Sequence, residues 1–437
     1  MCLQPDTVRA SAESQLNLYQ LGICVSCFAQ ALSDVRQQFQ CKSAARNPKD
    51  DGRRTPTFMS IPFKQKLSVG AYVVKQKLLG NKRYPLVLML EPLFRCNLAC
   101  AGCGKIDHPD DVLDKRLSVA ECMEAVDECG APVISIPGGE PLLHKEMPEI
   151  VRGIVARKKF VYLCTNALLL KKRMDDYTPS PYLTFSVHLD GDRERHDEAV
   201  CQEGVFDRAV EAIQMALARG FRVSVNCTLF SGETPERVAA FLDYLVDLGV
   251  EAATISPGFS YERAPQQHVF LQRQATRQLF RDIFKVGATR RGARKWRLNH
   301  SSLYLDFLAG NQNYQCTPWG SPARNVFGWQ KPCYLMADEG YAPTFAALMK
   351  DTPWEKYGSS SNPKCAQCMA HCGYEPTAVN AAMANPLKAA WVALRGPRTR
   401  GPMVDNDVPI TPPTGTREYP VHLMMKAPTE ETQVTGR

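Results

Sequence analysis

Short apolar runs alternate with helix-like patterns along the middle of the chain. Six runs rich in β-branched and other apolar residues indicate strands: Leu86–Glu91, Val133–Ile136, Phe160–Cys164, Leu183–Leu189, Arg222–Phe230 and Ala252–Ser256. Apolar residues at helical spacing follow or separate them: Ser118–Cys129, Glu146–Ala156, Val205–Ala218, Pro235–Leu248 and Gln272–Lys285. Strands that alternate with helices are typical of a parallel sheet covered by helices. We therefore predict an α/β fold, a partial (β/α)6 TIM-like barrel, with catalytic groups at the carboxyl ends of its strands.

The pattern changes on both sides of this region. Residues 1–58 carry Cys24 and Cys27, a weak helical pattern and a polar run, and we expect a dispensable extension before a basic segment at 59–84. The barrel is expected at 85–300, followed by a small Cys-rich C-terminal domain at 301–385 in which cysteines lie among Gly, Pro and aromatic residues. Residues 386–437 combine a basic segment with a Pro- and Thr-rich tail, which predicts disorder.

Composition and charge narrow the class of protein. The chain is 44% hydrophobic and 22% charged, as in ordinary globular proteins, and it has no apolar run of transmembrane length and no signal peptide. Its 17 cysteines therefore predict metal binding in a reducing compartment and not a disulfide framework, so we expect a cytoplasmic protein.

The net charge of +8 is concentrated in the two flanking segments. Residues 59–84 hold six Lys or Arg and no acid, and residues 377–403 hold four and no acid. A nucleic-acid enzyme would more often spread basic residues through its core, so no nucleic-acid partner is expected. The apolar spacing after Pro62 predicts a helix, which either lies on an anionic membrane surface or packs over one end of the barrel with its lysines in water.

Three cysteines follow the first strand in the spacing C-x3-C-x2-C: Cys96, Cys100 and Cys103. Iron–sulfur clusters are held by Cys thiolates at short spacings, and in a four-iron cubane three cysteines leave one iron free to bind another molecule. The alternative is a structural zinc site completed by His108. Zinc sites usually show paired C-x2-C or Cys/His spacings, so the spacing favours a [4Fe-4S] cluster.

Two groups of residues at later strand ends are candidates for ligand binding. Gly138 and Gly139 would let backbone approach a ligand, and the Glu140 carboxylate could hold an ammonium group, although a tight turn explains the same residues. Polar side chains share one face of the fourth and fifth strands: Ser186, His188 and Asp190, then Ser224, Asn226 and Thr228. Such residues are costly inside a barrel unless they meet a ligand, water or one another.

Cysteines elsewhere provide further candidates. Cys164 ends the third strand, where a thiol can donate a hydrogen atom to a radical or act as a small buried apolar residue, and the adjoining Thr165 and Asn166 are candidate cofactor contacts. The C-terminal region holds a candidate second metal site made of Cys316, Cys333, Cys365, Cys368 and Cys372. An auxiliary iron–sulfur cluster and zinc both suit that set.

The cysteine loop, followed one β/α unit later by Gly138-Gly139-Glu140, resembles the cofactor site of radical S-adenosylmethionine (SAM) enzymes. Within this superfamily the chain resembles the adenosyl-hopene transferases of hopanoid biosynthesis from Met59 to about Arg400. The resemblance is carried by six segments: Gly70–Leu78, Tyr84–Cys96, Ser135–His144, Phe185–Gly191, Cys316–Gly320 and Gln330–Cys333.

The resemblance implies an enzyme that adds a 5′-deoxyadenosyl radical, made from SAM, to diploptene. It implies that Cys96, Cys100 and Cys103 bind the cluster, that Gly138, Gly139 and Glu140 bind the amino group of SAM, and that Ser186 and Asn226 contact SAM. The implied partners are SAM, diploptene and an electron donor such as flavodoxin or ferredoxin, with contact to the inner membrane face. The alternatives are a peptide-modifying radical SAM enzyme with an auxiliary cluster and a non-catalytic zinc-binding protein.

Overall fold

The structure is a computed structural model that describes residues 62–259, 264, 266–292 and 295–404. All of these belong to one compact unit, which begins at Phe58. The predictions made for residues 1–58, including Cys24 and Cys27, and for most of the tail lie outside the described residues.

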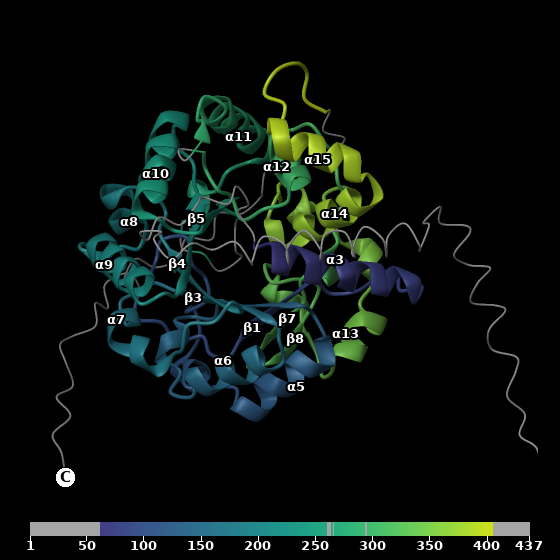
Figure 1. Ribbon diagram of the computed structural model, residues 1–437. Helices are drawn as coiled ribbons and strands as arrows, with labels where there is room; N and C mark the ends of the chain where they lie inside the picture. Colours follow the sequence, from purple (N-terminus) through teal and green to yellow (C-terminus); the bar gives the residue numbers. More distant parts are fainter. Residues whose placement is uncertain (1–61, 260–263, 265, 293–294, 405–437) are drawn as a thin grey trace, which may run out of the picture. The chain divides into compact units, whose positions relative to one another are not determined.

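A nine-stranded sheet runs through this unit in the order β6-β5-β4-β3-β2-β1-β7-β8-β9 (Figure 1). Strands β1 to β7 pair in parallel, and β8 and β9 complete the sheet in antiparallel fashion. Among the described residues the edge strands β6 and β9 do not pair with each other, so the sheet is open. The strands are β1 (Val87–Glu91), β2 (Val133–Ile136), β3 (Phe160–Thr165), β4 (Leu183–His188), β5 (Arg222–Leu229), β6 (Ala252–Pro257), β7 (Ala323–Asn325), β8 (Gly328–Gln330) and β9 (Tyr341–Ala342).

Helices follow the strands and cover the outer face of the sheet (Figure 1). Local signals in the sequence set their ends: Ser118 and Glu121 form a capping box before one helix, and Gly130 and Gly249 end two helices in left-handed geometry. The helices are α3 (Phe63–Leu78), α4 (Asp110–Leu113), α5 (Val119–Cys129), α6 (Met147–Ala156), α7 (Leu170–Arg173), α8 (Arg193–Ala199), α9 (Val205–Ala218), α10 (Pro235–Leu248), α11 (Arg273–Gly287), α12 (Ser302–Leu308), α13 (Phe345–Asp351), α14 (His371–Ala384) and α15 (Pro386–Arg395).

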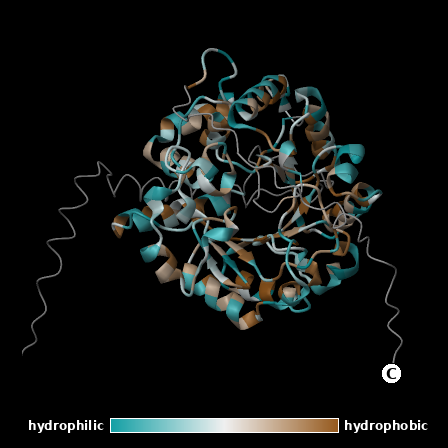
Figure 2. Ribbon diagram, turned by 180° about the vertical axis from the view of Figure 1, so that it is seen from behind, coloured by the Kyte–Doolittle hydropathy of each residue, from teal (hydrophilic) through white to brown (hydrophobic). Residues whose placement is uncertain are grey.

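The two faces of the sheet differ in polarity. The face under the helices is apolar and buried, with Leu88, Ile134, Leu163, Phe185, Val225 and Ile255 in one core cluster. The strand register places polar residues together on the opposite face, where Cys164 lies beside Ser186, Ser186 beside Ser224, and His188 beside Asn226. In Figure 2 the strands carry mostly hydrophobic residues, whereas hydrophilic residues lie along the outer turns of the helices. The alternation predicted from the sequence therefore gives an apolar outer core and a polar inner face.

The C-terminal region continues the sheet. Strand β7 pairs with β1, and Met89 lies opposite Ala323 in that pairing. The Cys-rich region expected at 301–385 is thus joined to the barrel edge by hydrogen bonds, and residues 316–333 lie next to the end of β1. The sequence did not reveal β7, β8 and β9, because strands of two or three residues are too short to show a periodic pattern.

Helix α3 packs against the barrel through one of its faces. Val73 is fully buried with Tyr84 and Leu86, and Gln65 donates a hydrogen bond to the Tyr162 hydroxyl (3.0 Å). This is the packing expected of a helix over one end of the barrel. No helix among the described residues is long and apolar enough to cross a membrane.

Candidate active site

The loop that carries the three cysteines is held against the segment that follows β2. The Gly139 N–H donates to the Leu93 carbonyl (3.0 Å) and the Glu140 N–H donates to the Arg95 carbonyl (2.9 Å). A Cβ atom on Gly139 would lie 2.2 Å from the Phe94 oxygen and 2.3 Å from the Arg95 oxygen. Gly139 is therefore required by contact between two backbone segments, and its part in binding a ligand stays a prediction.

The three thiols of this loop lie close to one another in surroundings of low polarity. Burial, the Glu140 carboxylate and the neighbouring Cys103 raise the pKa of Cys96 to about 12. Burial, followed by Cys103 and Cys96, also raises the pKa of Cys100 well above its usual value. Thiols in such a place ionise only when a cation is bound among them, so the donor set fits a cationic metal cluster.

No group of three or more His, Cys, Asp or Glu side chains in the described residues gathers closely enough to hold a single metal ion. His108, the fourth ligand of the zinc alternative, stacks on the Phe94 ring with centroids 4.9 Å apart.

Glu140 is a fully buried carboxylate held by residues at the end of β3. Its Oε1 accepts hydrogen bonds from the Thr165 hydroxyl (2.8 Å) and the Leu142 N–H (3.0 Å), and its Oε2 accepts from the Asn166 N–H (2.8 Å). Burial raises the pKa of Glu140 to about 7, although these donors oppose the shift. Thr165 and Asn166 thus position Glu140, and the cofactor contact that the sequence predicts for them stays a prediction.

Asn166 also connects Glu140 to the cysteine loop. Its side-chain amide donates to the Asn97 Oδ1 atom (2.7 Å) and lies 3.8 Å from the Cys96 sulfur. One residue therefore touches both the predicted cluster ligand and the predicted ammonium site. The structure brings these two parts of the site together although they lie some 40 residues apart in the sequence.

A histidine–aspartate pair lies at the end of β4, with the aspartate buried and the histidine partly exposed. His188 Nε2 lies 2.7 Å from Asp190 Oδ2, and Asp190 Oδ1 accepts a hydrogen bond from the Thr228 N–H (2.7 Å). Burial opposes the charge on His188, but Asp190 outweighs it and raises the pKa of the histidine. His188 in turn holds the pKa of Asp190 below its usual value despite burial. This pair puts a fixed dipole beside Asn226, which lies opposite His188 in the sheet.

Ser186 is buried on the same inner face, directly beside Cys164. The Cys164 sulfur lies 3.6 Å from the Ser135 hydroxyl, and burial raises the pKa of this thiol to about 11. Cys164 is therefore kept as an S–H group at neutral pH. Other cysteines, namely Cys122, Cys129 and Cys227, are buried in the apolar outer core.

The five cysteines of the predicted second site gather beside the barrel. Burial, followed by Cys368, Cys333, Cys372 and Cys365, raises the pKa of Cys316. A Cβ atom on Gly373 would lie 2.4 Å from the Cys316 sulfur, so this glycine makes room for the thiol. The five thiols come from the segment after α12, the loop after β8, the segment that precedes α14 and the first turn of α14. Their donor set fits a second metal centre.

A buried polar network lies between the two cysteine groups. Lys105 Nζ lies 3.1 Å from Glu91 Oε2 and 4.0 Å from the centre of the Tyr334 ring. Gln330 donates to the carbonyls of Cys333 (2.7 Å) and Tyr334 (3.0 Å), and accepts from the Asn325 amide (3.0 Å). Asn325 in turn lies opposite Glu91 in the sheet, which closes the network. No motif predicts this network, because its members are spread over some 240 residues.

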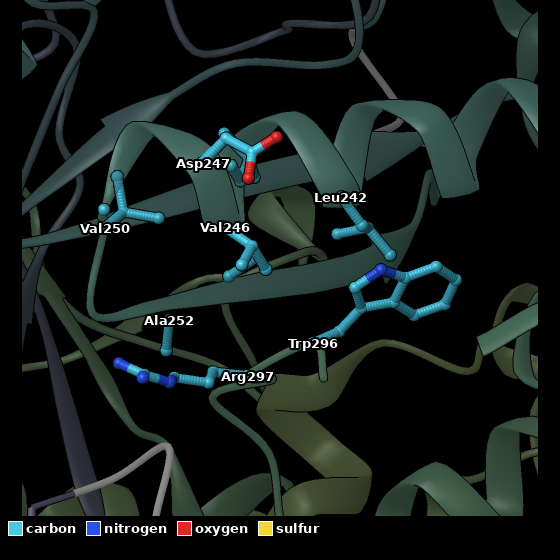
Figure 3. A pocket seen from close by; sticks show the side chains of 10 residues that line it. Leu242, Val246, Asp247, Val250, Ala252, Trp296 and Arg297 are labelled. Atoms are coloured by element: carbon cyan, nitrogen blue, oxygen red, sulfur yellow. The ribbon is translucent and has the colours of Figure 1, made fainter. Parts of the chain in front are cut away.

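A cavity of about 340 Å³ lies elsewhere, at the amino end of β6 (Figure 3). It is lined by Leu242 and Val246 of α10, Ala252, Trp296 and Arg297, among others. None of the candidate site residues lines it. It lies at the end of the sheet away from the cysteine loop, and we assign it no part in the chemistry.

Comparison with known proteins agrees with the cysteine loop. Residues 90–245 match the family model described as the Radical SAM superfamily. This match covers about a third of the chain and contains the cysteine loop and Glu140. After it, residues 253–392 match a domain of unknown function, DUF3463, which begins at β6 and includes all five cysteines of the second site. The radical SAM family implies a [4Fe-4S] cluster and SAM as cofactors, and the residues described above fit both.

The curated relatives match only about a third of this chain. They include a GTP 3',8-cyclase of Listeria welshimeri, 28% identical over 160 residues, which are 35% of this chain and 48% of that protein. An Fe-coproporphyrin III synthase of Methanosarcina barkeri is 30% identical over 139 residues, 31% of this chain and 35% of that protein. The chain thus spans half or less of the length of these relatives.

Among solved structures, Streptococcus suis SuiB bound to the precursor peptide SuiA has the same fold, with a TM-score of 0.50 and 15% identity. The match covers 79% of this chain and 83% of that one. It therefore extends beyond the radical SAM domain.

The comparisons contradict the resemblance to adenosyl-hopene transferases. The relatives that match carry other names, GTP 3',8-cyclase and Fe-coproporphyrin III synthase, and the C-terminal match is to a domain of unknown function. The motifs that carried the resemblance lie largely in the cofactor site, and a cofactor site is common to enzymes with different substrates. Hopanoid and lipid metabolism therefore have no support as the setting of this enzyme.

Proposed function

We propose that this chain is a radical SAM enzyme with a second iron–sulfur centre, which modifies a substrate held against the polar inner face of the sheet. The observation that carries the proposal is the arrangement around Glu140. Its buried carboxylate touches Asn166, which also touches Cys96 and Asn97 of the cysteine loop. A ligand ammonium that pairs with Glu140 would therefore lie beside the cluster formed by Cys96, Cys100 and Cys103.

When bound, the cluster supplies one electron that cleaves SAM into methionine and a 5′-deoxyadenosyl radical. The protein orients SAM for this step. Glu140 receives the ammonium group and stays ionised beside it, since an adjacent positive charge lowers a raised carboxyl pKa. Gly138 and Gly139 keep that segment against the cysteine loop. Ser186 and Asn226 offer hydroxyl and amide groups on the inner face, and the His188–Asp190 pair fixes the carboxyl end of β4.

Cys164 is placed to end the reaction. Its thiol is protonated and lies on the inner face, so it can donate a hydrogen atom to a substrate radical as its S–H bond breaks. The thiyl radical left behind must then take up one electron and one proton. The electron comes from the reductant that feeds the clusters. In this role Cys164 controls which product forms, but it takes no part in SAM cleavage.

The second centre is the feature that best separates the candidate functions. Five thiols are more than one zinc ion needs, and a [4Fe-4S] cluster uses three or four of them. Peptide modification is the alternative that the comparisons favour. SuiB, which was solved with a precursor peptide, shares the fold over 79% of this chain.

The test is anaerobic reconstitution with iron and sulfide, followed by incubation with SAM and dithionite. We expect about eight irons per chain, and 5′-deoxyadenosine that depends on both reagents. Replacing Cys100 with Ala should abolish 5′-deoxyadenosine formation and remove about half of the iron. Replacing Cys122 with Ala, a buried thiol outside both sites, should change neither. Iron-free protein that binds about one or two zinc ions would overturn the proposal.

The substrate class follows from the same incubation with added candidates. GTP, an iron porphyrin and a mixture of short peptides would each be analysed by mass spectrometry. A peptide that changes mass in a SAM-dependent way supports the peptide-modifying alternative. A change in GTP or in the porphyrin alone would refute it.

A further inference from the structure

Helix α15 carries apolar residues on two opposite sides. On the side toward the rest of the unit, Val392 is buried, and the Ala389 carbonyl accepts a hydrogen bond from the Ser302 hydroxyl (2.8 Å). On the other side Leu387 is 87% exposed, Trp391 56% and Leu394 78%. A helix that only covers the core needs apolar residues on the side toward the core and not on the side toward solvent.

The exposed residues form one continuous strip. Their spacing of i, i+4 and i+7 places all three within a narrow arc of the helix, because each residue turns the helix by about 100°. Val392 lies roughly opposite to that arc. Large apolar side chains gathered on a surface mark a binding surface more often than isolated ones do. We call Leu387, Trp391 and Leu394 the α15 strip.

Four basic residues lie on or just after the helix that carries this strip. Lys388 and Arg395 lie along one edge of the strip, and Arg398 and Arg400 follow; all four are exposed. Residues 376–404 contain no Asp or Glu. The Arg395 guanidinium lies 3.9 Å from the centre of the Trp391 ring, which keeps a cation next to the most polar of the three apolar side chains.

We propose that the α15 strip binds to the surface of an anionic lipid bilayer. A helix that lies in a membrane interface has this arrangement, with Leu and Trp toward the acyl chains and Lys or Arg at the level of the headgroups. A protein partner would need an apolar groove rimmed with acids, and nothing in the unit points to one. The inference is independent of the proposed radical chemistry, because none of its residues belongs to the candidate active site.

The first experiment is flotation of the full-length protein with phosphatidylcholine vesicles that either contain or lack phosphatidylglycerol. We expect binding that needs phosphatidylglycerol and is released by high salt. Trp391→Gln should weaken binding several-fold, and the triple variant Leu387→Gln/Trp391→Gln/Leu394→Gln by about tenfold or more. The matched control is Tyr244→Gln, which removes a partly exposed aromatic ring from α10 and should leave binding unchanged.

Circular dichroism and iron content would show that each variant is folded. Equal binding of the triple variant and of Tyr244→Gln would overturn the proposal, as would equal binding to vesicles with and without phosphatidylglycerol. The proposal would also be overturned if the wild-type chain self-associates in light scattering and does not float, while the triple variant is monomeric. That result would indicate an interface between two copies of the chain.

Discussion

Gly139 offers the sharpest test of how the site is assembled. In Gly139→Ala the new Cβ would lie 2.2 and 2.3 Å from two backbone oxygens, more than 1 Å inside ordinary contact. Neither oxygen belongs to a flexible side chain, so the two segments must separate. Overpacking of this kind costs roughly 1–3 kcal/mol, and weakening the hydrogen bonds of Gly139 and Glu140 to the loop adds about 1 kcal/mol each. We expect the free energy of unfolding to fall by about 3–5 kcal/mol, a large part of the stability of an ordinary domain.

The assay is guanidinium unfolding of the metal-free protein, followed by iron analysis after reconstitution. Because the substitution separates the cysteine loop from the segment that positions it, iron retention should fall together with stability. The matched control is Gly70→Ala in α3, where no atom lies within 4 Å of the new Cβ. That change should stabilise the helix by up to about 1 kcal/mol. If Gly139→Ala unfolds within about 1 kcal/mol of the wild type and retains full iron, the packing argument is wrong.

Three further predictions concern the buried groups. Because the pKa of Glu140 is raised to about 7, the folded chain binds one more proton than the unfolded chain between pH 4.5 and 7. The free energy of unfolding of the metal-free protein should therefore fall by up to about 3 kcal/mol as pH rises through that window, and Glu140→Gln should remove most of this pH dependence. An unchanged pH dependence in the variant would refute the raised pKa of Glu140. Cys164→Ala and Cys164→Ser should each leave the rate of 5′-deoxyadenosine formation within about twofold of the wild type. Both should change the ratio of products formed from the substrate. An unaltered product ratio would exclude hydrogen donation by the thiol. Gly373→Ala should displace the Cys316 sulfur and reduce the iron content per chain by about half. Electron paramagnetic resonance should still show the SAM-cleaving cluster. A full iron content would show that Cys316 is not a ligand.

The fold was largely accessible from the sequence because its signals are local. The ranges Val133–Ile136, Val205–Ala218 and Pro235–Leu248 are the same in prediction and structure, and each is a periodic run with a clear start or end. Beyond about residue 300 periodicity fails. Helix α14 contains Pro376, which argues against a helix, and tertiary packing overrides that preference.

The candidate site was likewise predictable only in part from the sequence. The cysteines of the loop were found because three metal ligands lie within eight residues. The partners of Glu140 could not be found, because their roles depend on the pairing of β2 with β3 and not on any motif. The resemblance to adenosyl-hopene transferases was wrong for a related reason: the motifs that carried it report mainly the cofactor, which enzymes with different substrates share.

The network of Glu91, Lys105 and Tyr334 makes the two cysteine groups thermodynamically dependent on each other. Lys105 is two residues from Cys103, and Tyr334 is next to Cys333, so ordering either end of the network also orders the other. By linkage, a metal bound at one centre raises the metal affinity of the second centre, and a metal bound at the second centre raises the metal affinity of the first by the same factor. A variant that cannot load one centre should therefore still load the other, but only at a higher iron concentration than the wild type needs.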